Sequence, residues 1–128
     1  MTPESALHLA KARQCLANAQ VSLGVALVND AGRGAYLAAF HAASAFIFER
    51  TGKFTKTHQG VQREFHRLAR GETRLDASFP AFLSQAYNLK AVADYELGPD
   101  ADIPAERATA AIETAGRFVE RIADLIGP

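Results

Sequence analysis

Apolar residues recur at intervals of three and four along the chain, and this periodicity predicts five helices and no convincing strand. The helices are expected at about residues 3–28, 33–51, 57–70, 80–97 and 104–126. Their connections are short, and short connections favour antiparallel neighbours. The predicted fold is therefore all-α, an up-and-down bundle of four to five antiparallel helices in a single domain over residues 1–128.

Several helix ends carry recognisable signals. Thr2 is expected to cap the first helix, with Pro3 at its first position, and Thr57 is expected to cap the third. The stretch 29–32 reads as a turn, and Gly52 reads as a left-handed terminator of the second helix. These signals place a polar turn with the triplet 56–58 between two of the helices.

Composition places the protein among ordinary globular domains. Of 128 residues, 48% are hydrophobic and 22% are charged. No apolar run approaches the roughly 18 residues that cross a bilayer, and no leader pattern begins the chain, so we expect a cytoplasmic protein without membrane contact. The single cysteine, Cys15, agrees with a reducing compartment and is expected to be a small buried thiol.

Charge is unevenly distributed although the formal net charge is zero. Residues 50–74 contain seven basic and two acidic side chains, whereas the rest of the chain contains seven basic and twelve acidic ones. An asymmetry of this kind can steer an anionic partner to one face.

The third predicted helix concentrates this basic charge on one side. Arg63, Arg67 and Arg70 lie opposite an apolar face at 100° per residue. An ordinary solvated surface would have the same appearance. Arginine, however, suits bidentate contacts to phosphate, so these three residues are candidate contacts to RNA or to a nucleotide phosphate.

The histidines supply the other candidate chemistry. His41 follows Phe40 on a strongly apolar helix, where a titratable ring needs a partner, although a core histidine with one hydrogen bond would also fit. His58 and His66 are too far apart on one helix to share a metal ion. No metal-ligand spacing, G-x-S-x-G elbow or phosphate-binding glycine loop is present, so neither a metal nor a cofactor is expected.

Three segments in order identify a family resemblance. They are Arg33-Gly34-Ala35-Tyr36 with Phe40-His41-Ala42-Ala43, then Lys56-Thr57-His58-Gln59-Gly60-Val61, and then Ala86-Tyr87-Asn88-Leu89-Lys90 with Ala93-Asp94-Tyr95. Together they resemble the HEPN domain family (higher eukaryotes and prokaryotes nucleotide-binding) over about residues 7–122. The resemblance implies a bundle of four or five helices, usually a homodimer. Many members are metal-independent endoribonucleases, often toxins paired with a minimal nucleotidyltransferase antitoxin.

The ribonuclease signature of that family is an arginine followed after four to six residues by a histidine, and this chain lacks it. Seven residues separate Arg33 from His41 and Arg50 from His58. Where the motif is usually found, Asn88 and Asp94 have the right separation, but this pair supplies neither a cation nor a base that titrates near neutrality. The sequence is therefore a variant without the ribonuclease motif.

The same segments nevertheless predict a polar site. Its candidate ligand-binding residues are Arg33, Tyr36, His41, Lys56, His58, Asn88, Lys90 and Asp94. Within it, Asp94 is expected to pair with Arg33 or Lys56, and His41 or His58 is expected to complete the cluster. An internal network that fixes helix register is the alternative.

Three functions remain open from the sequence. The first is a non-catalytic module that binds nucleotide or RNA, associated with toxin–antitoxin systems and acting with a nucleotidyltransferase-type or other protein partner. The second is a metal-independent endoribonuclease toxin in which His41 or His58 is catalytic. The third is an interaction scaffold without a ligand. A homodimer is expected from the resemblance, and the aromatic run 46–48 suggests an apolar patch for a second subunit to cover.

Overall fold

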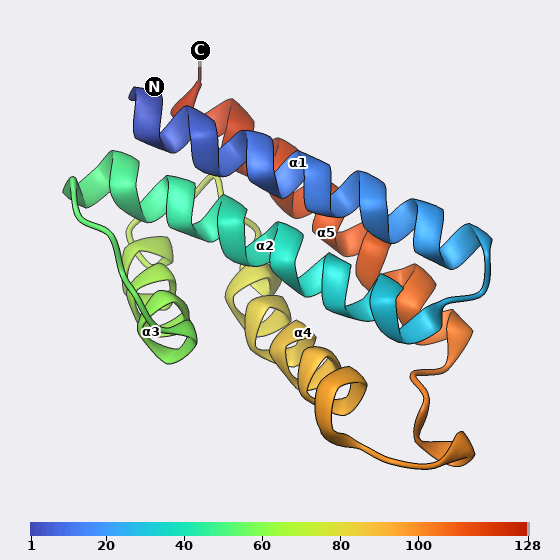
Figure 1. The fold of residues 1–128 in the computed structure, drawn as a ribbon. Coiled ribbons are helices and arrows are strands. Elements are labelled where there is room, and N and C mark those ends of the chain that lie inside the picture. Colours follow the sequence, from blue (N-terminus) through green and yellow to red (C-terminus); the bar gives the residue numbers. More distant parts are fainter. Residues whose placement is uncertain (128) are drawn as a thin grey trace.

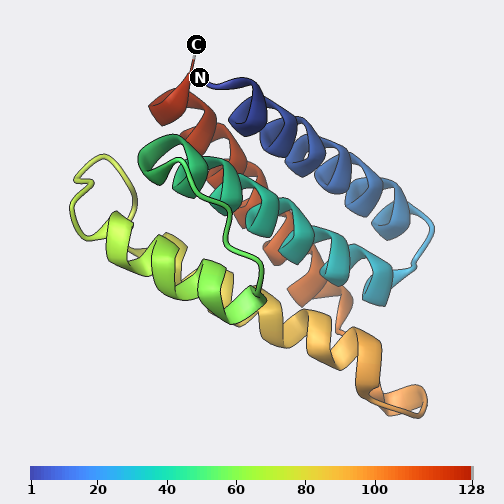
Figure 2. The same cartoon turned by 60° about the vertical axis from the view of Figure 1, so that its left-hand side comes forward.

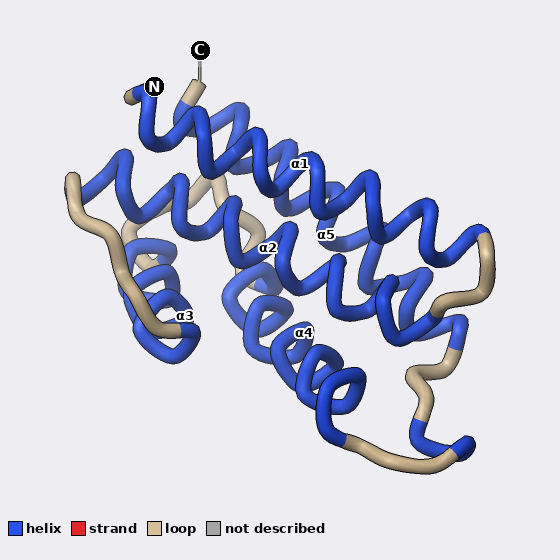
Figure 3. The backbone as a smooth tube through the Cα atoms, viewed as in Figure 1, coloured by secondary structure: helices blue, strands red, loops and turns tan. Residues whose placement is uncertain are grey.

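The computed structural model describes residues 1–127, and over that range it is built from helices without any strand. The all-α prediction is thus confirmed (Figure 3). The elements are α1 (Pro3–Gly24), α2 (Val28–Thr51), α3 (His58–Ala69), α4 (Ser78–Tyr95), the short 3-10 turn η1 (Pro99–Ala101) and α5 (Ala105–Ile126).

Helix α2 is the centre of the bundle, because it contacts each of the other four α-helices. Figures 1 and 2 show α1 and α5 on one side of α2 and the pair α3 and α4 on the other. Along the chain, α2 runs opposite to α1 and α4, whereas α5 runs in the same direction as α2 (Figure 1). The up-and-down order therefore holds for α1, α2, α4 and α5, with α3 added beside α4.

The small side chains of α2 explain its central position. Its fully buried alanines are Ala31, Ala35, Ala38, Ala39, Ala42, Ala43 and Ala45. Short side chains let neighbouring helices approach closely on several sides. A side chain at Gly34 would place its Cβ 2.8 Å from the Cβ of Ala19, so α1 and α2 are closest there.

Phenylalanine rings join the two sides of the bundle. The ring of Phe65 on α3 lies 5.7 Å from that of Phe46 on α2 and 5.2 Å from that of Phe118 on α5. Phe79 on α4 contacts Phe118 at 5.0 Å. One core thus extends from α3 to α5, and these edge-to-face and tilted contacts add to the burial of apolar surface.

The aromatic run 46–48 does not form the exposed patch that the sequence suggested. Phe46 and Ile47 are 0% and 1% exposed within this single chain, and the partly buried Phe48 packs on Phe54 with ring centroids 4.5 Å apart. A second subunit is not needed to cover them, because α3 and the segment after α2 already do so. The expected homodimer consequently rests on the family resemblance alone.

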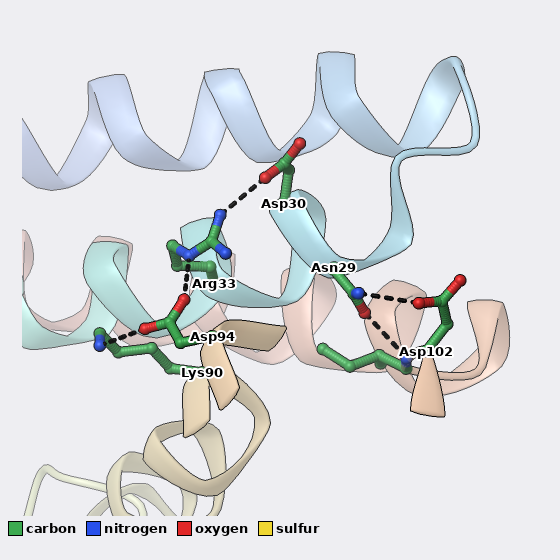
Figure 4. Close-up of polar contacts among 7 residues, drawn as sticks. Asn29, Asp30, Arg33, Lys90, Asp94 and Asp102 are labelled. Atoms are coloured by element: carbon green, nitrogen blue, oxygen red, sulfur yellow. Dashed lines mark hydrogen bonds and ion pairs between the residues drawn. The ribbon is translucent and has the colours of Figure 1, made fainter. Parts of the chain in front are cut away.

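The first turn lies earlier in the chain than the sequence predicts. Helix α1 ends at Gly24 and α2 begins at Val28, so the stretch 29–32 is helical and not a turn. Ala26 makes the reversal with φ of 63°, a left-handed conformation that usually belongs to glycine. The Asn29 side chain accepts from the backbone N–H of Ile103 and donates to Asp102, which ties the start of α2 to the loop before α5 (Figure 4).

The predicted caps are confirmed. The Thr2 hydroxyl accepts from the backbone N–H of Ser5 at 3.1 Å, and that of Thr57 accepts from Gly60 at 2.9 Å. Gly52 ends α2 with φ of 71°. Within residues 1–127, none of the helices combines the length and the apolar character that crossing a bilayer requires.

Candidate functional site

Charged side chains of α2 and α4 meet around the Asp94 carboxylate (Figure 4). Arg33 Nε donates to Asp94 Oδ1 at 2.7 Å, and Lys90 Nζ donates to Asp94 Oδ2 at 2.6 Å. A second nitrogen of Arg33 donates to Asp30 Oδ1, also at 2.6 Å. The predicted pairing of Asp94 with Arg33 is therefore present, and each cation already has a carboxylate.

Electrostatics keep Arg33, Lys90 and Asp94 ionised near neutral pH. Lys90 and then Arg33 lower the pKa of Asp94, and the Asp94 carboxylate in turn raises the pKa of Lys90. The side chains of Arg33, Lys90 and Asp94 are 33%, 19% and 20% exposed. This cluster thus links α2 to α4 and is internally neutralised, so an anionic ligand would have to displace Asp94 to reach the two cations.

A tyrosine and a histidine form the second part of the site. The hydroxyl of the fully buried Tyr36 lies 2.6 Å from His58 Nδ1, which joins α2 to the first residue of α3. The Tyr87 ring of α4 lies 5.4 Å from both rings, and the Phe40 ring lies 4.8 Å from His58. His58 is therefore held by one hydrogen bond and by aromatic rings on several sides.

Burial sets the protonation state of this pair. It raises the pKa of Tyr36, with a smaller contribution from Tyr87. Burial, followed by the charge of Lys90, lowers the pKa of His58. Near neutral pH the pair is thus a phenol and an uncharged imidazole. Because Tyr36 occupies Nδ1, the ring nitrogen left to exchange a proton with a ligand is Nε2.

Three predicted site residues lie outside this cluster, and two of them, Lys56 and Asn88, lie at the surface. Lys56 and Asn88 are both exposed, and neither forms a hydrogen bond or ion pair with any other residue in the range 1–127. Asn88 follows Tyr87 by one position, which turns it about 100° away from the face that carries Tyr87, Lys90 and Asp94. The Asn88 and Asp94 pair therefore does not form a joint site.

His41 lies on the α1 side of α2 and is not a neighbour of Arg33 or Asp94. Its ring is stacked on that of His8 with centroids 6.1 Å apart, and its buried Nδ1 has no hydrogen-bond partner within residues 1–127. Burial, the charge of His8 and that of Lys11 lower the pKa of His41 to about 4. His41 is thus an uncharged imidazole in a separate pocket.

The arginines of α3 border an open groove of about 570 Å³ between α3 and α4. Its lining comprises Gln59, Gln62, Arg63, His66, Arg67, Arg70 and Ser84. Arg67 donates to Glu64 at 3.2 Å, whereas Arg63 and Arg70 form no ion pair within residues 1–127. The predicted arginine face therefore exists, and it borders a shallow, open groove.

No set of metal ligands accompanies these features. Among residues 1–127, no group of three or more histidine, cysteine or acidic side chains is placed to hold a metal ion. Cys15 is buried, and burial raises the pKa of its thiol. The site therefore offers arginine and lysine charges, an imidazole and aromatic rings as its chemistry.

Several site residues were missed from the sequence. Asp30 lies three positions before Arg33, and this spacing could have indicated the ion pair. Gln62 and Ser84, which hydrogen-bond across the groove at 3.2 Å, carried no signal because they come from different helices. The contacts of His8 and Phe54 with each other, at 5.1 Å, depend in the same way on tertiary packing.

The comparison with protein families agrees with this architecture. The sequence model of the HEPN domain matches residues 5–125, nearly the entire chain. The chain belongs to the HEPN domain family. A search among curated proteins found no match. A HEPN domain is a nucleotide-binding or ribonuclease-type module.

Proposed function

We propose that this HEPN domain is a non-catalytic module that binds RNA or a nucleotide and acts with a protein partner. The observation that supports RNA most is the groove of about 570 Å³ lined by Arg63, Arg67 and Arg70. Two of these guanidinium groups have no ion pair within residues 1–127. Arginine binds phosphate in a bidentate manner, and a row of arginines follows a polyanion better than a single site does.

The missing ribonuclease motif supports binding without cleavage. No arginine precedes a histidine by the required spacing. At the corresponding place on α4, Asn88 is exposed and Asp94 is held by Arg33 and Lys90. A carboxylate with a lowered pKa in this setting is a poor proton donor at neutral pH, so Asp94 does not supply the general acid that cleavage needs.

RNA binding is tested by reversing the charge of the arginine face. In a gel-shift titration, the double variant Arg63→Glu and Arg67→Glu should bind a short single-stranded RNA at least tenfold more weakly than the wild type. The dependence of its affinity on salt should also become shallower, since each lost phosphate contact removes about 0.7 from the slope of log K against log salt.

The matched control is the double variant Arg107→Glu and Arg121→Glu. These exposed arginines lie on α5 and make the same change in net charge away from the groove. Equal loss of binding in both double variants would mean that net charge alone drives association. Unchanged binding after reversal of Arg63 and Arg67 would refute the groove as the RNA site.

The protein partner and the homodimer follow from family membership. We propose a nucleotidyltransferase-type partner and a toxin–antitoxin association, because members of this family often occur with such proteins. Light scattering on the isolated chain should give twice the monomer mass at micromolar concentration. A monomer mass that persists at higher concentration would contradict the dimer, and co-expression with the product of the neighbouring gene tests the partner.

One observation favours a divergent endoribonuclease as the second candidate. His58 is an uncharged imidazole with Nδ1 bound to Tyr36, and this arrangement is suited to a general base acting through Nε2. Expression of an active enzyme would arrest growth, and His58→Ala would relieve that arrest. The variant His41→Ala tests the other candidate histidine, which lies in the pocket of His8. Harmless expression of the wild type, with intact RNA in a cleavage assay, would remove this candidate.

The charge cluster of α2 and α4 also allows the third candidate, a scaffold without a ligand. Its cations are neutralised by Asp94 and Asp30, as expected of a network that only fixes the helices. Any ligand that binds the folded state alone raises the melting temperature. If neither RNA nor nucleotides raise it, the scaffold is the function that remains.

A further inference from the structure

A continuous row of rings crosses from α4 to α1 and is not explained by the arginine groove. We call it the aromatic row and define it as Tyr87, His58, Phe40, His41, His8 and Phe54. Successive ring centroids lie 5.4, 4.8, 5.3, 6.1 and 5.1 Å apart in that order. The six rings come from four helices and the segment after α2, so folding assembles a surface that no single sequence motif predicts.

The row is most open to solvent at its α1 end. Phe54 is 55% exposed, and the other five rings are only partly buried. At its α1 end, Leu7, His8, His41 and Phe54 line an apolar surface pocket of about 280 Å³ with Lys11 and Glu4 at its edge. Phe54 and Leu7, which is 73% exposed, form an apolar area that water does not favour. Rings left accessible in this way can stack on another planar group.

The three imidazoles of the row are uncharged near neutral pH. Burial lowers the pKa of His8 and of His58, and the pKa of His41 falls to about 4. Two lysines lie beside the row: Lys11 at the pocket, and Lys90, which is paired with Asp94, near His58. The arginine groove begins at Gln59, the residue after His58. Neutral rings beside a cationic groove are the arrangement by which proteins bind single-stranded nucleic acid.

We propose that the aromatic row stacks the unpaired bases of single-stranded RNA whose phosphates contact the arginine groove. This inference rests on the proposed function and adds the strand type and the base-binding surface. The pocket of His8, His41 and Phe54 receives one base.

Base pairing determines whether an RNA strand can stack its bases on the aromatic row. In a duplex the bases are stacked on each other and their faces are not accessible, so only the phosphate contacts remain. We therefore expect the domain to bind a single-stranded RNA of mixed sequence more tightly than the same sequence paired with its complement. Sequence preference should be small, since every base has a face that can stack.

The test measures single-stranded and duplex RNA binding by gel shift for Phe54→Ala, His8→Ala and the control Val21→Ala. Loss of one stacked base should weaken single-strand binding about 5- to 150-fold for Phe54→Ala and for His8→Ala. Duplex binding and the salt dependence should stay as in the wild type. Val21→Ala removes exposed apolar surface from α1 away from the pocket, and it should leave both affinities nearly unchanged.

A second variant separates stacking from apolar contact. Phe54→Leu keeps an apolar side chain but removes the ring, so it should weaken single-strand binding almost as much as Phe54→Ala. Melting curves for all variants check that the fold is intact. Full binding by Phe54→Leu, or equal affinity of the wild type for both strand types, overturns the aromatic row as the base-binding surface.

The arginine variants keep the two proposals distinguishable. If Arg63→Glu with Arg67→Glu abolishes binding while the ring variants bind normally, the groove binds RNA and the row does not. If the wild type binds no RNA at all, both proposals are wrong.

Discussion

Replacement of His41 by phenylalanine tests whether a buried, unpaired imidazole controls the response of this fold to acid. The pKa of His41 is about 4 in the folded chain, against an ordinary value of 6.5. A histidine whose folded pKa is lowered binds its proton first in the unfolded chain. Stability is therefore highest above about pH 6.5 and falls as the pH decreases toward about 4.

The size of the effect follows from the two pKa values. Between about pH 7 and about pH 5, a shift of this size removes about 2 kcal/mol from the free energy of unfolding. Because the ring is only partly buried, solvent screens it, and we expect about 1–2 kcal/mol. The variant His41→Phe keeps a ring beside His8 and Phe40 but cannot be protonated. Between about pH 7 and about pH 5, this variant should therefore lose about 1–2 kcal/mol less of its free energy of unfolding than the wild type does.

Urea unfolding followed by circular dichroism at several pH values measures this difference. His66→Gln serves as the control for the loss of a histidine, since His66 is exposed on α3. At about pH 7 the His41→Phe variant should be at least as stable as the wild type, because a buried unpaired nitrogen is removed. If wild type and His41→Phe remain parallel between about pH 7 and about pH 5, the burial argument is wrong.

Three further changes test the packing and the charge cluster. Asp94→Asn should lower the free energy of unfolding by about 1–2 kcal/mol at neutral pH, because two partly exposed cations lose a carboxylate. The pKa of Asp94 is lowered, so this difference between variant and wild type should vanish as the pH falls below about 4. Urea unfolding at neutral pH and below about pH 4 measures it. Gly34→Ala should destabilise by about 1–3 kcal/mol, since its Cβ would lie 2.8 Å from that of Ala19, whereas Gly24→Ala meets nothing within 4 Å and should be neutral in thermal unfolding. Thr57→Ala removes the cap of α3 and should cost about 1 kcal/mol in thermal unfolding, and Thr57→Ser should retain it.

Helix content and the charge pair could be predicted because both depend on local spacing. Apolar periodicity and caps such as Thr57 mark helices within the chain itself, and Tyr87, Lys90 and Asp94 share a face by their spacing of three and four. The pairing of Asp94 with Arg33 could be predicted because the family resemblance implies that the helices that carry these two residues pack side by side.

The turn at residues 29–32 was mispredicted because a long-range contact overrides its local signal. Asn29 reads as a cap or turn residue, but its side chain bonds to Asp102 and Ile103 instead of to its own helix. Gly32 lies within α2, and a Cβ there would lie 2.5 Å from Cδ1 of Ile103, so glycine allows this close packing. No residue near position 30 indicates that this segment contacts a loop about seventy positions later in the chain.

The surroundings of His41 and Phe46 were also mispredicted, for a different reason. Both lie on α2, which is surrounded by helices, so its apolar residues do not form one stripe with a solvent side. A helix covered on several sides hides which face meets which neighbour. The sequence consequently placed His41 in the wrong cluster and suggested a patch at Phe46 that α3 already covers.

The placement of the tyrosines gives the protein a built-in optical probe. The chain has three tyrosines and no tryptophan. Tyr36 and Tyr87 lie at the His58 site, and Tyr95 is 75% exposed at the end of α4. Intrinsic phenol emission therefore comes from two rings at the site and one in solvent. Replacing Tyr95 by phenylalanine would leave an unlabelled protein whose emission reports only on the surroundings of His58.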